Sequence, residues 1–144
     1  MQFPGSSNFF DRYSGVDGGG KHGGVNHGKG DHFLQPIVAA ALFGMAAVFK
    51  DQYGITMAFG DMSSDNGSDP WQPGSVDHKG HGHSGRSGLD IDFRYVNSAG
   101  VSFQGQMNNK QFDVANNQTI YAVANTFGFT ENYQGTQGRL QGIK

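Results

Sequence analysis

The stretch PIVAAALFGMAAVF, residues 36–49, is the most apolar segment of this 144-residue chain. It is too short to cross a hydrocarbon core of about 30 Å, so it predicts a buried helix rather than a membrane span. Pro36 suits a first helical turn and Gly54 suits a helix end. The apolar side chains that would share one face of this helix, near 34–52, are Leu34, Val38, Ala41, Leu42, Met45 and Phe49.

Three segments of alternating polarity and a second predicted helix follow this helix in the sequence. Residues 55–62, ITMAFGDM, predict a strand, and residues 89–96 and 101–106 predict two more around the turn NSAG at 97–100. Residues 114–126 predict a helix that starts near Asp113 or Asn117 and turns Ile120, Val123, Ala124 and Phe127 inward. The order of elements predicts an α+β fold: a small antiparallel β-sheet with a buried helix packed on it.

Glycine-rich loops account for much of the remaining chain. The sequence contains 24 glycines and only 35% hydrophobic residues. Residues 1–32, which include GGGKHGGVNHGKGDH, predict a glycine-rich arm, and residues 63–88 form a long polar loop. The length of the chain fits a single domain over residues 1–144.

The charge and the missing cysteines limit the function. A net charge of -2 and a pI near 6.3 give no basic footprint, so we expect neither nucleic acid nor insertion into a membrane. The start MQFPGSSNFF has no features of a signal peptide. Without cysteine, a metal site would have to use histidine, aspartate, glutamate or water.

The stretch GHGHSGRSGLDIDFRYV, residues 80–96, gathers the polar groups most typical of a site. If residues 89–96 form a strand, Asp90 and Asp92 share one face, where their carboxylates repel unless a cation or hydrogen bonds hold them. His81 and His83 precede this strand and could share a metal ion with it. The alternative is a solvated strand face beside passive loop histidines.

The segment GLDIDFRY, the upstream GDMS at 60–63 and the histidines between them resemble a group of zinc peptidases. This group includes the lysostaphin-type enzymes, the D-Ala-D-Ala metallopeptidases and the penicillin-insensitive murein endopeptidases, and the last branch is the most similar. The resemblance covers about residues 37–127 and implies a zinc-dependent peptidase acting on bacterial cell-wall peptides. A histidine and an aspartate would be the first two zinc ligands.

The resemblance leaves alternatives for these ligands. Aligning GLDID places Asp92 at the metal aspartate and Gly85 at the histidine, so His83 reaches the ion only with a two-residue insertion. We favour His83 with Asp92, and His81 and Asp90 stay open as alternative ligands. Asp61 would orient a ligand histidine or cap the end of its strand, and Arg86 and Arg94 would bind substrate or balance neighbouring acids.

The family also has a third ligand and a catalytic histidine in a late His-x-His motif. All six histidines here precede residue 84. We therefore expect that motif in a segment after Lys144, or an early histidine in its place. His22, His27 and His32 are candidates, although a flexible arm explains them as well.

The predicted function is a zinc peptidase that cleaves the cross-links or stems of peptidoglycan. The small size would suit the toxin domain of a secreted antibacterial effector delivered to the periplasm, with an immunity protein as its partner. The alternative is a non-catalytic module that binds cell-wall peptide or a protein. In either case Trp71 could form a surface on which a ligand binds, or it could be a hydrophobic side chain that packs within the long loop.

Overall fold

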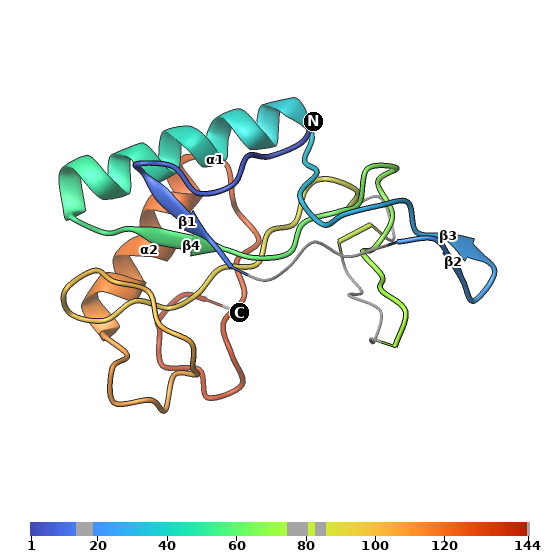
Figure 1. Ribbon diagram of the computed structural model, residues 1–144. Coiled ribbons are helices and arrows are strands. Elements are labelled where there is room, and N and C mark those ends of the chain that lie inside the picture. The colour runs from blue at the N-terminus through green and yellow to red at the C-terminus, as the bar shows by residue number, and fades with distance from the viewer. Residues whose placement is uncertain (14–18, 75–80, 83–85, 144) are drawn as a thin grey trace. The chain divides into compact units, whose positions relative to one another are not determined.

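The computed structural model describes residues 1–13, 19–74, 81–82 and 86–143 and confirms the predicted α+β class (Figure 1). Its elements in chain order are β1 (Phe10–Arg12), β2 (Lys21–His22), β3 (Val25–Asn26), α1 (Pro36–Val48), the π-helical turn η1 (Phe49–Tyr53), β4 (Met57–Phe59) and α2 (Val114–Thr126). No helix among these described residues is long and apolar enough to span a membrane.

The chain divides into two compact units, and the division cuts through β1, α1 and β4. The first unit comprises Met1–Ser7, Arg12–Ala40 and Phe59–Asp92, and the second comprises Asn8–Asp11, Ala41–Ala58 and Phe93–Lys144. Each unit is therefore assembled from segments that are far apart in the sequence.

The apolar stretch forms the predicted helix. α1 begins at Pro36 and continues into η1, which ends at Gly54 in a left-handed conformation with φ 66°. Leu42 and Phe49 are fully buried on its inner face. Phe43 meets Phe10 of β1 edge to face, with ring centroids 5.6 Å apart, so the helix packs on β1, a strand that the sequence did not predict.

The sheet is smaller than the sequence predicts. β4 covers only residues 57–59 of the strand expected over 55–62, and it pairs with β1. The strand predicted from residue 89 is wrong for its first part, because the Leu89 N–H donates to the Arg86 carbonyl and Gly88 has φ 70°. These contacts make a turn, so Asp90 does not continue a strand face with Asp92.

The hairpin that follows is present but short. The Arg94 N–H donates to the Ala58 carbonyl at 3.0 Å, and Val96 pairs antiparallel with Ser102. The turn between them is held by the Asn97 side chain, which accepts from the backbone of Val101 at 3.0 Å. The last backbone bond of this pairing runs from the Phe103 N–H to the Tyr95 carbonyl at 3.1 Å, so the strand expected over 101–106 is shorter than predicted.

The glycine-rich arm is part of the fold, which corrects the prediction for residues 1–32. It contains β1 and the antiparallel hairpin β2–β3, in which His22 pairs with Val25. Phe3 and Phe10 are buried, and Phe3 contacts Phe59 edge to face at 6.2 Å. These isolated aromatic residues tie the segment into the core despite its glycine content.

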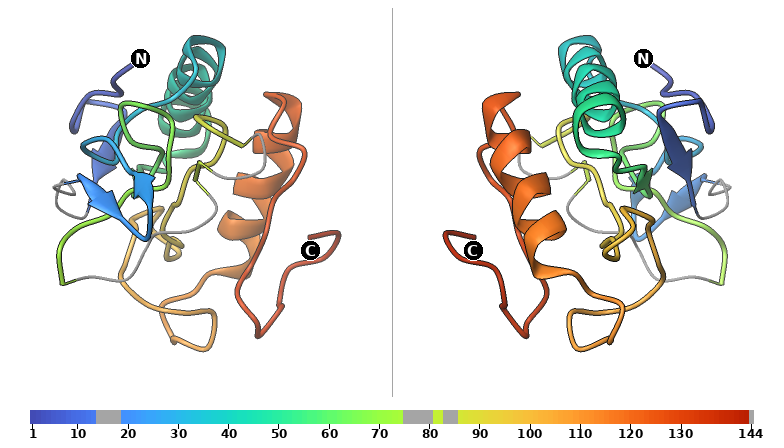
Figure 2. Two further views of the ribbon diagram at one scale, coloured as in Figure 1. Left: turned by 90° about the vertical axis from the view of Figure 1, so that its right-hand side faces the viewer. Right: turned by 90° about the vertical axis from the view of Figure 1, so that its left-hand side faces the viewer.

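α2 is held by its first turn and by one buried amide. The Asp113 carboxylate caps the helix by accepting from the Asn116 N–H at 2.8 Å, as predicted. Asn117, fully buried, accepts from the Val96 N–H and donates to the Val96 carbonyl, at 3.0 and 2.8 Å. The segment after α2 runs back along the helix (Figure 2), where Gln118 pairs with the backbone of Gln141.

Replacing Asn117 by alanine should destabilise the protein strongly. The change leaves the buried N–H of Val96 without its partner and leaves the Val96 C=O with only the 3.3 Å bond from the Asp113 N–H. An unpaired buried group costs about 1–3 kcal/mol. We expect the free energy of unfolding in urea to fall by about 2 kcal/mol or more. Asn125→Ala, at an exposed position of the same helix, is the matched control and should change it by less than about 0.5 kcal/mol. Equal effects of the two changes would contradict this role of Asn117.

Candidate metal and proton-transfer site

The motif GDMS, residues 60–63, is the centre of a polar cluster in the first unit. The Gly60 N–H donates to the Asp92 carbonyl at 2.8 Å, and the Asp92 N–H donates to the Asp61 carbonyl at 3.0 Å. On the other side, the Met62 N–H donates to the Asp31 carbonyl at 2.8 Å. These bonds bring three aspartates from distant parts of the chain onto neighbouring segments.

The His81 side chain lies beside Asp92, whose backbone is hydrogen-bonded to this motif. Its Nε2 lies 3.6 Å from Oδ2 of Asp92, and the side chains are 9% and 58% exposed. Burial disfavours the charged imidazole, but the nearby carboxylates of Asp92 and Asp61 outweigh burial, so the pKa of His81 is raised. The Asp90 carbonyl adds to this effect.

His81 is placed by the glycine that follows it. The Gly82 N–H donates to the Asp69 carboxylate at 2.6 Å, and a Cβ on Gly82 would lie only 2.2 Å from the Ser68 carbonyl carbon. Only glycine allows this close approach of the two backbones. Gly82 is thus required by the packing of the backbone, for a reason separate from the chemistry of His81.

A second histidine lies beside the same motif. Nδ1 of His32 contacts Oδ1 of Asp31, whose side chain is 1% exposed. Burial and the positive charge of Arg12 lower the pKa of His32, against the opposing charge of Asp61. His32 belongs to the predicted arm, so the sequence did not separate it from the histidines of the hairpin.

Arg12 supplies positive charge to this cluster. Its Nη1 donates to the Met62 sulfur at 3.5 Å, and the charges of Asp31 and Asp61 act on the guanidinium. Burial lowers the pKa of Arg12 against these two carboxylates. Arg12 was missed because it stands alone in β1, 19 positions before Asp31 along the printed sequence.

The other predicted site residues have separate positions. Arg86 binds Asp90 through two hydrogen bonds of 2.6 and 2.5 Å, so each balances the charge of the other. Arg94 lies in the second unit. His83, the favoured ligand, is outside the described residues, and its role stays a prediction. Among the described residues, no three histidine, aspartate or glutamate side chains form a group that could hold a metal ion.

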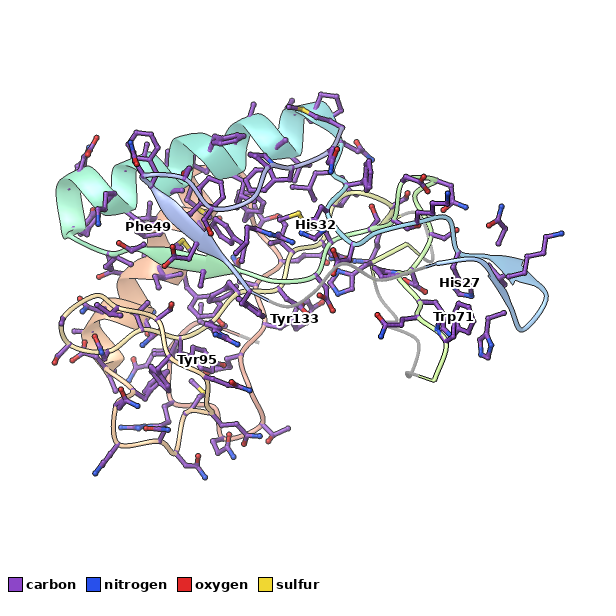
Figure 3. The ribbon with its side chains drawn as sticks, in the orientation of Figure 1. His27, His32, Phe49, Trp71, Tyr95 and Tyr133 are labelled. Carbon is purple, nitrogen blue, oxygen red and sulfur yellow. The ribbon has the colours of Figure 1, made fainter. Side chains whose placement is uncertain are left out.

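Trp71 lies in an aromatic group with two histidines of the first unit (Figure 3). Its ring stacks on His22 at 4.6 Å with an interplanar angle of 13°, and His27 lies 6.0 Å away. His27 is buried, and its Nδ1 is 2.9 Å from the Asp69 carbonyl. These contacts give His22 and His27 packing roles beside the polar loop.

No protein-family model, curated protein or solved structure matches this chain.

In the metal-free protein, Asp92→Asn should lower the pKa of His81, because it removes the carboxylate that stabilises the imidazolium. An NMR titration of the ring measures this directly. Asp90→Asn is the control, since that carboxylate binds Arg86, and it should shift the pKa much less. Equal shifts would show that Asp92 is not the partner.

The same shift predicts a pH dependence of stability. Because the folded-state pKa of His81 is raised, its protonation stabilises the metal-free fold below the ordinary histidine pKa. This contribution is lost as the pH rises through the raised value. Asp92→Asn should remove most of this dependence in urea unfolding measured across that range, and an unchanged profile would contradict the assignment.

Proposed function

We propose that this protein is a zinc-dependent peptidase that acts on the peptides of bacterial peptidoglycan. The observation that supports it most is the spacing of His81 Nε2 and Asp92 Oδ2, at 3.6 Å. This separation is longer than the usual range for a hydrogen bond, about 2.7–3.2 Å. Two ligands at about 2.1 Å from a tetrahedral zinc lie about 3.4 Å apart, so the pair is spaced as two ligands of one ion.

The chemistry of the donors fits zinc. An imidazole nitrogen and a carboxylate oxygen are ordinary zinc ligands, and the chain has no cysteine to compete with them. Asp31, Asp61 and Asp92 carry three negative charges beside the single positive charge of Arg12, so a divalent cation would reduce their repulsion. In this proposal His81 and Asp92 hold the ion, and Asp61 stabilises the arrangement by its charge.

Zinc bound here would polarise the scissile carbonyl and acidify a water molecule. The side chains of this site have distinct tasks around that chemistry. Buried His81 keeps one side of the site dry, whereas Asp92, at 58% exposure, leaves the other side open to water and substrate. A catalytic zinc site needs such an open position.

The substrate class comes from the resemblance of GDMS and GLDIDFRY to murein endopeptidases. We propose the peptide cross-links or stems of peptidoglycan as the substrate and the periplasm as the site of action. Delivery as the toxin domain of a secreted effector, with an immunity protein as partner, belongs to the same proposal.

A non-catalytic binding module is the second candidate. It is favoured by the absence of a third metal ligand among the described side chains. In that role the exposed Asp92 carboxylate would recognise an amine of a cell-wall peptide or protein. Such a module would bind peptide without stoichiometric zinc.

Zinc binding and peptide release from peptidoglycan together test the peptidase proposal. His81→Ala and Asp92→Asn should each weaken zinc binding by about 100-fold or more, because loss of a mere outer partner of a ligand costs about 10–100-fold. Zinc content is measured by mass spectrometry, and released muropeptides by chromatography.

Two further variants complete the comparison. His22→Ala, which changes a histidine stacked on Trp71, should keep zinc and activity. His83→Ala tests the ligand favoured by the sequence and should also reduce zinc binding. If neither His81→Ala nor Asp92→Asn changes the zinc content, the site is wrongly assigned. If zinc binds and no muropeptide is released, the peptidase proposal fails.

A further inference from the structure

His32 and Asp31 form a histidine–carboxylate pair that the zinc site does not use. Asp31 is 1% exposed and contacts Nδ1 of His32, whose side chain is 14% exposed. A carboxylate at Nδ1 favours the tautomer with its proton on that nitrogen. The other nitrogen, Nε2, then carries the lone pair that can accept a proton.

The pair is held rigidly against the GDMS motif. Besides the bond from Met62 to the Asp31 carbonyl, Phe33 pairs antiparallel with Ser63. The Phe33 N–H donates to the Ser63 carbonyl at 3.0 Å, and the Ser63 hydroxyl donates to the Phe33 carbonyl at 2.7 Å. His32 is thus fixed between two backbone anchors, a requirement for a group that transfers protons at a defined position.

Asp61 connects this pair with the proposed zinc ligands. Asp61 lies between Gly60, whose N–H donates to the Asp92 carbonyl, and Met62, whose N–H donates to the Asp31 carbonyl, so one short segment connects both pairs. The charge of Asp61 acts on both His32 and His81. The charged groups that face His32 are Asp31, Asp61 and Arg12. Burial and Arg12 favour the neutral ring, which is the form that accepts a proton.

His32 suits proton transfer better than metal binding. The described part of the chain has no group of three side chains that would place His32 with His81 and Asp92 on one ion. His32 lies outside the proposed ligand set, is oriented by a buried carboxylate and is linked through residues 60–62 to the segment of Asp92, which is the arrangement of a general base.

We propose that His32 is the proton shuttle of this peptidase and that Asp31 is its positioning residue. The inference rests on the proposed function. Nε2 of His32 takes a proton from the water as its oxygen bonds to the scissile carbonyl carbon. The imidazolium then returns that proton to the amide nitrogen as the C–N bond breaks, so that water is divided between a carboxylate and an amine. No oxidant or further reactant is needed.

Zinc content and turnover separate this role from a ligand role. His32→Gln should keep zinc, and the rate of muropeptide release should fall about 10²–10⁴-fold, the usual contribution of a general acid–base group. His22→Gln is the matched control and should keep both. Added imidazole should restore part of the rate in His32→Ala. If His32→Gln loses zinc as His81→Ala does, His32 is a ligand and the inference is overturned.

A measurement on the unaltered chain avoids any effect of the substitutions on folding. In ¹⁵N NMR of the metal-free wild-type protein, His32 should carry its proton on Nδ1 near neutral pH. In a separate comparison, Asp31→Asn should change the balance of the His32 tautomers and should keep zinc binding. A His32 ring with its proton on Nε2 would overturn the inference. Failure of the proposed function has a different signature, because the wild-type protein would then bind no zinc or release no muropeptide.

Discussion

The backbone hydrogen bonds of residues 59–63 are the constraint on which the rest of the first unit depends. Phe59 accepts from Tyr13 of the segment after β1, Gly60 donates to Asp92, and Met62 donates to Asp31. Three stretches of the chain therefore meet along one short segment. A Cβ at Gly60 would lie 2.5 Å from the Tyr13 ring, so a larger residue there would have to displace this ring. Each of these stretches brings a charged or titratable side chain to the same place.

The charges of the cluster then determine what the site can do. Three carboxylates and one guanidinium leave an excess of negative charge beside two histidines whose pKa values move in opposite directions. The pKa of His81 is raised because the carboxylates of Asp92 and Asp61 outweigh the effect of burial. The pKa of His32 is lowered by burial and by the positive charge of Arg12. Two imidazoles in different environments can perform different tasks, one holding a cation and the other accepting a proton.

Glycine has two separate uses in this chain. At Gly60 and Gly82 it allows backbones or rings to approach at distances that a side chain would prevent. At Gly54 and Gly88 it allows the left-handed conformation that ends a helix or makes a turn, with φ 66° and 70°. The composition alone indicates loops, and it does not show that several of these glycines lie inside the packed structure.

The sequence by itself determined both helices, because apolar periodicity, Pro36, Gly54 and the Asp113 cap are local signals. It also predicted Asp92 and Asp61 as members of one site, with His83 as the favoured histidine and His81 as an alternative, and of these two histidines the described structure places His81 beside Asp92. Only the tertiary structure showed that Arg12, Asp31 and His32 belong to the same cluster. It also showed that Asp90 forms an ion pair with Arg86. The reason is physical: helix signals repeat within a few residues, whereas these partners meet through backbone pairing between segments tens of residues apart, which no local pattern records.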